Sequence, residues 1–269
     1  MLPLHITTLA DGAISYVETG AGIPVIFLHG IGSSARSWQA AFDVAPADWH
    51  VMAWNAPGYP PSSHLPADWP NASDYAQRLK ALLDARNLQK THLVGHSLGC
   101  LIAARFAKLY PACVKSLTLA SCALGHARLP EEERARLLTA RLTDVEELGA
   151  RGMAEKRGPR LLGPNASAEQ IRAVVDTMAS IDAKGYAQGA RMLSQGDLIG
   201  DIETLAPDLP LQFIYGSADV ITPPASNQKA IAARPSAPVS VLEAAGHACY
   251  IEQPQAFMTA VQGLVSQHA

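Results

Sequence analysis

Residues 91–99 read Thr-His-Leu-Val-Gly-His-Ser-Leu-Gly, and Leu98–Tyr110 continues with the apolar spacing of a helix that ends before Pro111. The pattern Gly-x-Ser-x-Gly centred on Ser97 therefore lies directly after a predicted strand and directly before a predicted helix. So sharp a turn requires a strained backbone, and glycines two positions away on either side let the neighbouring chain approach. We interpret Ser97 as a nucleophile at the end of a strand.

A serine hydroxyl is a weak nucleophile without a general base. His247 follows the predicted strand Val239–Leu242 by a short loop, and Asp219 follows another predicted strand. The chain order Ser, Asp, His is one of the known orders for a triad in which the acid orients the imidazole. The stretch after a third predicted strand, residues 121–126, contains no carboxylate. We therefore predict a catalytic triad of Ser97, Asp219 and His247.

An oxyanion hole needs two convergent backbone N–H donors. One is expected from Leu98, the residue after the nucleophile, where the next helix also directs its positive end toward the site. The other is expected from Ile31, in the loop that follows the predicted strand of residues 25–28. His29 in the same loop is interpreted as a structural residue.

Apolar runs bounded by turn residues alternate with longer amphipathic segments along most of the chain, which predicts a mainly parallel sheet flanked by helices. Residues 122–205 differ, because they are rich in charge and contain no convincing strand. We interpret residues 122–205 as an inserted helical lid, and residues 1–121 and 206–269 as the core. The predicted strands are 25–28, 50–54, 91–94, 114–120, 211–215 and 239–242, and the predicted core helices are 73–86, 98–110, 226–233 and 254–265.

Composition limits the classes of function. Of the 269 residues, 48% are hydrophobic and 17% charged, as in a globular protein. A formal net charge of −3 makes nucleic acid an unexpected partner. No apolar run approaches the ~20 residues of a membrane span, and the start does not look like a secretory signal. The four scattered cysteines suit reduced thiols and show no metal-ligand spacing. We expect a cytoplasmic protein without metal or cofactor.

The motifs His29-Gly30, Gly95–Gly99, Asp219 and His247 together resemble those of the α/β-hydrolase fold superfamily, over a length from about His5 to the last helix. This resemblance implies an α/β fold with a mainly parallel eight-stranded sheet, flanking helices and an inserted helical lid. It also implies hydrolysis through the triad without a metal or an organic cofactor.

Within the superfamily, the chain is most similar to the 3-oxoadipate enol-lactonases and meta-cleavage-product hydrolases of aromatic catabolism. The similarity to the enol-lactonases lies in the lid stretch of residues 182–187, Asp-Ala-Lys-Gly-Tyr-Ala. Two positions depart from these groups. His29-Gly-Ile-Gly32 stands where enol-lactonases usually carry Asn-Ser-Leu-Gly, and His96 stands where meta-cleavage-product hydrolases usually have Asn.

Both groups act on small anionic substrates, so the resemblance implies a small-molecule substrate of this kind and a cationic side chain in the pocket. Arg191 is our candidate, since a guanidinium can bind a carboxylate with two parallel hydrogen bonds. Trp38 and Met192 are candidates for the apolar lining, although core packing explains them equally well. The protein is expected to be a monomer or a small homo-oligomer.

Three functional hypotheses follow. The first is a serine hydrolase that cleaves a small carboxylic ester or lactone through an acyl-enzyme. The second keeps the triad but cleaves a carbon–carbon bond or an amide. The third is a receptor or signalling module that uses the pocket mainly to bind a ligand, because the fold alone does not determine the function.

Overall fold

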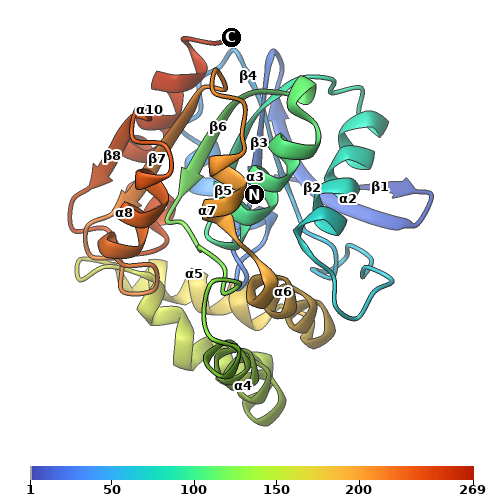
Figure 1. Ribbon diagram of the computed structural model, residues 1–269, viewed down its shortest axis with the longest axis vertical. Coiled ribbons are helices and arrows are strands. Elements are labelled where there is room, and N and C mark those ends of the chain that lie inside the picture. Colours follow the sequence, from blue (N-terminus) through green and yellow to red (C-terminus); the bar gives the residue numbers. More distant parts are fainter. Residues whose placement is uncertain (1) are drawn as a thin grey trace.

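Eight strands form one sheet in the order β1-β2-β4-β3-β5-β6-β7-β8 in the computed structural model, which describes residues 2–269 (Figure 1). β2 pairs antiparallel with both β1 and β4, and all other neighbouring strands pair in parallel, so the expected mainly parallel eight-stranded sheet is confirmed. The strands are β1 Leu4–Leu9, β2 Gly12–Gly20, β3 Ile23–Leu28, β4 Trp49–Trp54, β5 Thr91–His96, β6 Val114–Ala120, β7 Leu211–Gly216 and β8 Val239–Leu242.

Strand β3 shows why the central strands are apolar along their whole length. Its successive side chains enter two separate buried clusters, Val25 and Phe27 on one face of the sheet and Ile26 and Leu28 on the other. Side chains alternate with a period of two along a strand, and helices cover both faces here. Neither set of side chains meets solvent, so no polar alternation is needed.

Two groups of helices cover the two faces of the sheet. On one face α2 packs against α3, α3 against α7, and α7 against α8, while on the other face α10 packs against both α1 and α9. Asn71 caps α2, and its side chain accepts a hydrogen bond of 2.8 Å from the backbone N–H of Ser73. These helices are α1 Gln39–Phe42, α2 Ala72–Ala85, α3 Leu98–Leu109, α7 Leu198–Glu203, α8 Pro224–Ala232, α9 Cys249–Glu252 and α10 Pro254–Val265.

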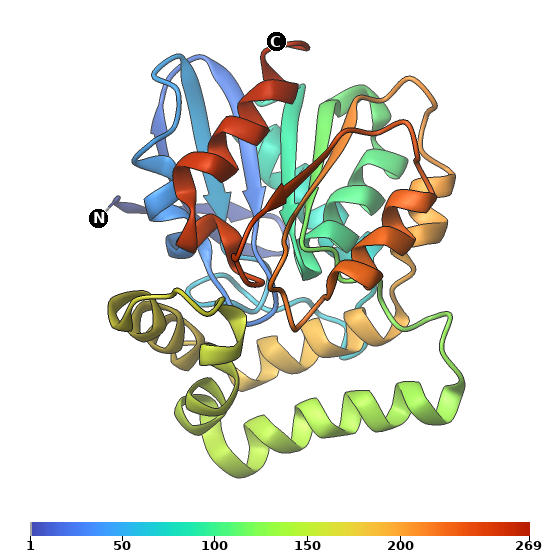
Figure 2. The same cartoon turned by 90° about the vertical axis from the view of Figure 1, so that its left-hand side faces the viewer.

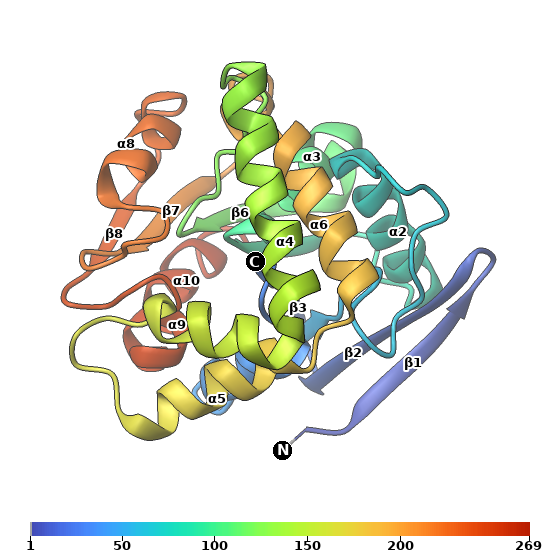
Figure 3. The same ribbon diagram turned by 90° about the horizontal axis from the view of Figure 1, so that it is seen from below.

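Three further helices form a layer at the edge of the sheet where the parallel strands end (Figure 2). They are α4 Glu131–Arg157, which changes direction at Gly149, α5 Ala168–Ala179 and α6 Ala183–Gln195. α4 packs against both α5 and α6, and Figure 3 shows α4 and α6 side by side across this edge. We call α4–α6 the cap.

The stretch between β6 and β7 contains no strand within the described residues, but its last helix does not belong to the cap. α7 packs against α3 at the side of the sheet, and Asp201 of α7 pairs with Arg105 of α3 at 2.9 Å. The helices over the sheet edge therefore end with α6, whereas the expected lid extended to residue 205.

One especially close contact joins the cap to the rest of the chain. A Cβ atom on Gly185 of α6 would lie 1.8 Å from the carbonyl oxygen of Gly58, so only glycine permits this approach. Beside it, His64 Nε2 lies 2.6 Å from Oδ1 of Asp182, the residue that caps α6. These contacts hold α6 against the loop that follows β4.

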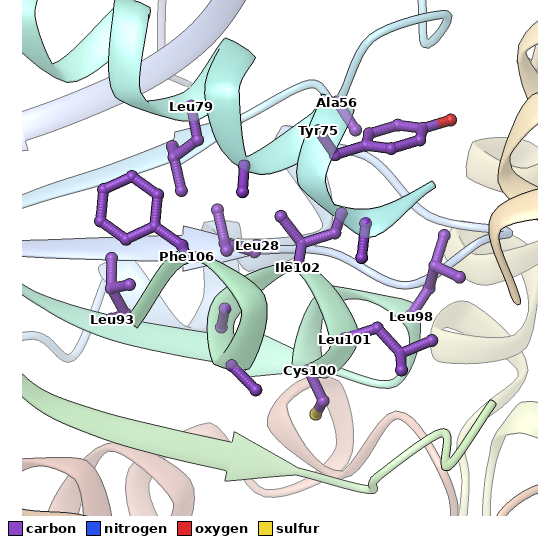
Figure 4. Packing of buried hydrophobic residues seen from close by; sticks show 14 of the residues in the cluster. Leu28, Ala56, Tyr75, Leu79, Leu93, Leu98, Cys100, Leu101, Ile102 and Phe106 are labelled. Atoms are coloured by element: carbon purple, nitrogen blue, oxygen red, sulfur yellow. The ribbon is translucent and has the colours of Figure 1, made fainter. Parts of the chain in front are cut away.

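Phe106 of α3 lies in the buried cluster between α3 and α2, with Leu79 of α2 and Leu93 of β5 (Figure 4). Its side chain is fully buried, whereas Leu109 at the end of the same helix is 42% exposed. We expect Phe106→Ala to lower the free energy of unfolding by about 3 to 5 kcal/mol, because the transfer of the ring to water and the cavity left behind both cost energy. Leu109→Ala should cost below about 1 kcal/mol. Urea unfolding of both variants checks this, and equal losses would contradict it.

Candidate active site

Ser97 lies on a sharp turn between β5 and α3. Its backbone angles, φ 53° and ψ −114°, are far from the helical and extended regions. A Cβ atom at Gly99 would lie 2.2 Å from the carbonyl oxygen of Leu28, and one at Gly95 would lie 2.5 Å from that of Gly99. Both glycines are therefore required by packing. The turn places Ser97 at the carboxyl edge of the sheet, facing the cap.

His247 and Asp219 meet at the same edge, in the loops that follow β8 and β7. His247 Nδ1 lies 2.8 Å from Asp219 Oδ2, and both side chains are buried. Because an ionised carboxylate can only accept, the imidazole carries its proton on Nδ1 and its lone pair on Nε2. The arrangement suits a base that the acid orients.

The Asp219 carboxylate is held in its ionised form by the loop around it. Its Oδ1 accepts the backbone N–H groups of Ile221 and Thr222, at 2.8 and 2.9 Å, and its Oδ2 also accepts the Thr222 hydroxyl. Burial by itself would raise the pKa of Asp219, but His247 and these hydrogen bonds outweigh it, so the pKa lies below its ordinary value.

His29 positions the loop that follows β3. Its Nδ1 donates to the carbonyl oxygen of Gly30 at 2.8 Å, and its Nε2 accepts from the backbone N–H of Ala56 at 3.0 Å. The Gly30 carbonyl and the Ile31 N–H belong to one planar trans peptide and point in opposite directions. By holding the carbonyl, His29 sets the direction of the Ile31 N–H, while Tyr59 donates to the Ile31 carbonyl at 2.7 Å.

The N–H of Ile31 has no hydrogen-bond partner within the described part of the chain. The N–H of Leu98 opens α3, where the first N–H groups have no acceptor within their own helix. Both residues line the same cavity as Ser97 and His247. Two unpaired donors are therefore present beside the serine.

His96, the residue before Ser97, is buried and its ring packs against the ring of His247. Its Nε2 donates to the carbonyl oxygen of His247 at 2.8 Å, and its ring packs against Tyr250 and Trp38. Burial, and then the neighbouring charge of His247, lower the pKa of His96 to about 3. Burial likewise lowers the pKa of His29 to about 4. Both imidazoles are therefore neutral near pH 7 and act as hydrogen-bonding groups.

A cavity of about 460 Å³ lies between the sheet edge and the cap, in the size range of small-molecule sites. Ser97 and His247 lie on the side of the sheet, and apolar residues of the cap, among them Val174, Met178 and Tyr186, form the opposite wall. A small, partly apolar substrate would thus lie against the serine hydroxyl.

The structure corrects the three pocket residues expected from the sequence, because none of them lines this cavity. Arg191 donates to the carbonyl oxygen of Asp68 at 2.8 Å and lies over the ring of Trp69, on the outer side of α6. Trp38 is fully buried and stacks on Tyr250, with ring centroids 4.0 Å apart. Met192 is fully buried in a hydrophobic cluster. Trp38 and Met192 are therefore core residues, and Arg191 makes its contacts outside the cavity.

The cationic residues that do line the cavity were missed in the sequence analysis. They are Arg141 and Arg157 of α4, Arg160 just after α4, and Lys229 of α8. For Arg141 the helical spacing places the side chain beside two apolar residues, but the sequence does not show which face of that helix turns toward the cavity. Arg141 lies three residues after Leu138 and four before Val145, and both of these are buried, so all three share the inner face of the helix.

No cluster of three or more His, Cys, Asp or Glu side chains suited to a metal ion occurs within residues 2–269. None of the helices described there is both long enough and apolar enough to cross a bilayer.

Comparison with known proteins defines the class. Residues 25–260 match the model of the alpha/beta hydrolase family, and the protein belongs to this family. We therefore class it as a hydrolase with the α/β-hydrolase fold.

Two solved structures and one relative illustrate the similarity. An esterase from Thermogutta terrifontis, solved with malate bound, has a TM-score of 0.87 at 23% identity, covering 99% of this chain and 100% of that chain. The enol-lactonase from Burkholderia xenovorans has a TM-score of 0.85 at 18% identity, covering 97% and 100%. The 2-hydroxy-6-oxo-6-phenylhexa-2,4-dienoate hydrolase of Comamonas testosteroni is 36% identical over 107 residues, which are 38% of this chain and 37% of that protein. The expected resemblance to both groups is confirmed.

The buried neutral histidines make stability depend on pH. An unfolded histidine has a pKa near 6.5, whereas folding lowers the pKa of His29 to about 4 and that of His96 to about 3. At a pH between the unfolded and the folded pKa of each histidine, the unfolded chain binds more protons than the folded chain. The free energy of unfolding therefore falls as the pH falls below about 6.5. At neutral pH each histidine should contribute on the order of 3 to 5 kcal/mol. This contribution is lost by about pH 4 for His29 and by about pH 3 for His96. Urea unfolding at pH 7.5, 5.5 and 4.5 measures this slope.

His29→Gln keeps one donor and one acceptor but does not titrate, so it should reduce the slope by up to one proton. The exposed His268 provides the control, and His268→Gln should leave the slope unchanged. An identical slope in His29→Gln and the unchanged protein would contradict the assignment.

Proposed function

We propose that the protein is a serine hydrolase that cleaves a small carboxylic ester or lactone through an acyl-enzyme. The observation that carries this proposal is the hydrogen bond of 2.8 Å between His247 and Asp219, at the cavity that holds Ser97 on its strained turn. The structural likeness to an esterase and an enol-lactonase favours the same bond type.

In the first half of the reaction, Ser97 Oγ attacks the carbonyl carbon and its proton passes to His247 Nε2. The carbonyl oxygen becomes an oxyanion that accepts hydrogen bonds from the N–H groups of Ile31 and Leu98, which are already in place. Asp219 stabilises the imidazolium. The intermediate then collapses, His247 gives its proton to the leaving oxygen, and the acyl group stays on Ser97.

The second half repeats these steps with water. His247 removes a proton from a water molecule, whose oxygen attacks the acyl carbon and forms the oxyanion again. Collapse releases the carboxylic acid and returns the proton to Ser97 Oγ. When the substrate is a lactone, the leaving oxygen belongs to the same molecule, and the product is a single hydroxy acid.

Hydrolysis of a carbon–carbon bond is the second candidate, and the similarity to a dienoate hydrolase over 107 residues favours it. The leaving group is then a carbanion that must be protonated, rather than an alkoxide. A panel of simple esters, lactones and dienoates separates the candidates, since the products differ while the triad is common to all.

Replacing the nucleophile tests the proposal. Ser97→Ala should lower kcat on p-nitrophenyl esters by about 10⁴-fold or more, because no acyl-enzyme can form. A fluorophosphonate should add to the unchanged protein at Ser97, which mass spectrometry detects, and not to the variant. Ser226, a second serine that lines the cavity, serves as the control, and Ser226→Ala should still be labelled. Turnover retained in Ser97→Ala would exclude the mechanism.

A further inference from the structure

Another close contact between the cap and the core reaches the loop that carries His247. Residues 161–163, between α4 and α5, pack against this loop. A Cβ atom on Gly163 would lie 2.4 Å from the carbonyl oxygen of Ala244, and one on Gly246 would lie 2.5 Å from the backbone nitrogen of Gly163. The two backbones therefore meet with no room for a side chain between them.

The side chain of Glu252 bridges the two sides of this contact. Glu252 is the last residue of α9, and the chain folds back so that its Oε2 accepts the N–H of Gly246 at 2.7 Å. Its Oε1 accepts the N–H of Gly163 at 2.8 Å. One half-buried carboxylate thus uses both of its oxygens, one for the loop of His247 and one for the cap.

The peptide that follows His247 is held from the core and from the cap. The carbonyl of His247 and the N–H of Ala248 belong to this one planar peptide and point in opposite directions. His96 of the core donates to the carbonyl at 2.8 Å. The N–H donates to the carbonyl oxygen of Leu161 at 2.8 Å. The core therefore fixes one side of this peptide, and the cap fixes the other.

The loop needs this support because its backbone is strained. Ala244 has a φ of 59°, in the left-handed region that favours glycine. Such a conformation persists only where the surrounding structure holds it. Ala244 lies three residues before His247, so a relaxation of the loop would move the imidazole. A displacement of about 1 Å at a reacting group can cost about 100-fold in rate.

We propose that Glu252 is a positioning residue, which ties the cap to the loop of His247 and aligns the imidazole with Ser97 only while residues 161–163 lie on that loop. The inference rests on the proposed function, because His247 is the base there. The contact of α6 at Gly185 involves no residue of the triad, whereas the contact through Glu252 lets the cap act on the base. Movement of the cap away from the sheet edge therefore lowers the reactivity of Ser97 as well as opening the cavity.

Glu252→Gln tests the proposal with a side chain of the same size. The amide keeps one acceptor oxygen but turns a donor toward the other N–H, so one of the two hydrogen bonds is lost. On p-nitrophenyl acetate, kcat per active site should fall by about 10- to 100-fold. KM should stay within about twofold, because His247 serves both halves of the reaction and both slow together. Fluorophosphonate labelling of Ser97 should slow similarly and still reach completion, which shows that the site is formed.

A spectroscopic measurement separates positioning from a general loss of stability. The proton that His247 Nδ1 donates to Asp219 gives a downfield 1H signal, which is assigned by its absence in His247→Gln. In Glu252→Gln this signal should broaden, because a less restrained imidazole exchanges the proton with water faster. Glu243 is an exposed glutamate of the same loop, and Glu243→Gln should keep the signal sharp and kcat within about twofold.

The cap side of the contact is tested without changing Glu252. In Gly163→Ala the added Cβ atom forces residues 161–163 away from the loop, so kcat should fall as in Glu252→Gln. The double variant should be no slower than the slower single one, because both changes break the same contact. Gly263 of α10 is the matched control, since a Cβ atom there meets nothing within 4 Å, and Gly263→Ala should leave kcat within about twofold.

The outcomes separate this proposal from the proposed function. An unchanged kcat and a sharp signal in Glu252→Gln would refute the role of Glu252 and leave the serine hydrolase intact. The same holds if Glu243→Gln is slowed equally, or if the losses in Gly163→Ala and Glu252→Gln multiply in the double variant. If Glu252→Gln does not fold, an unchanged kcat in Gly163→Ala refutes the link to the cap. Absence of both turnover and labelling in the unchanged protein would refute the proposed function, and with it the base that Glu252 positions.

Discussion

The site depends on one close approach of backbone, where the turn at Ser97 passes the end of β3. Gly99 lies so near the Leu28 carbonyl that a Cβ atom would be 2.2 Å from it, and a Cβ atom at Gly95 would be 2.5 Å from the Gly99 carbonyl at the start of α3. This contact lets the backbone at Ser97 adopt its strained angles and fixes α3 directly behind the serine. It also joins the loop after β3 to the start of α3, so the N–H groups of Ile31 and Leu98 have a defined relation to the hydroxyl. Strain at such a residue persists only because the surrounding packing holds it.

Two neutral histidines extend this rigidity to the rest of the site. His29 holds the peptide that carries the Ile31 N–H, and His96 holds the backbone carbonyl of His247. Each can do so only as an uncharged imidazole with a fixed tautomer, because a protonated ring would donate where it must accept or would bury an unpaired charge. These hydrogen bonds orient the Ile31 N–H and His247 at neutral pH. Because both imidazoles must stay neutral to make them, the free energy of unfolding falls as the pH falls.

The cap and the core supply different parts of the chemistry. The core places Ser97, His247 and Asp219 at the ends of parallel strands, where every loop reaches the same edge. The cap closes the opposite side with apolar groups and brings Arg141 above this edge. Because α6 is held by the Gly58 to Gly185 contact and α4 packs on α6, the position of Arg141 is linked to the loop after β4. In the proposed hydrolase, the residues that cleave the bond and those that form the opposite wall of the cavity thus come from different layers of the structure.

The local sequence pattern was enough to predict where the parallel strands of the sheet lie in the chain. Strands β6 and β8 and helix α10 lie at the expected residues, because continuous apolar runs and helical spacing reflect burial directly. The hairpin of β1 and β2 was not assigned, since β1 lies at the sheet edge and its half-buried residues lack a strong apolar run. Local pattern likewise identified Ser97, Asp219 and His247, which meet at the sheet edge. Ser97 lies in the Gly-x-Ser-x-Gly motif, and the other two follow later predicted strands. Arg141 and Arg191 look alike in sequence, each within a helical segment of the expected lid. Only the tertiary structure decided which faces the cavity, because the direction of a side chain on such a helix depends on what the helix packs against.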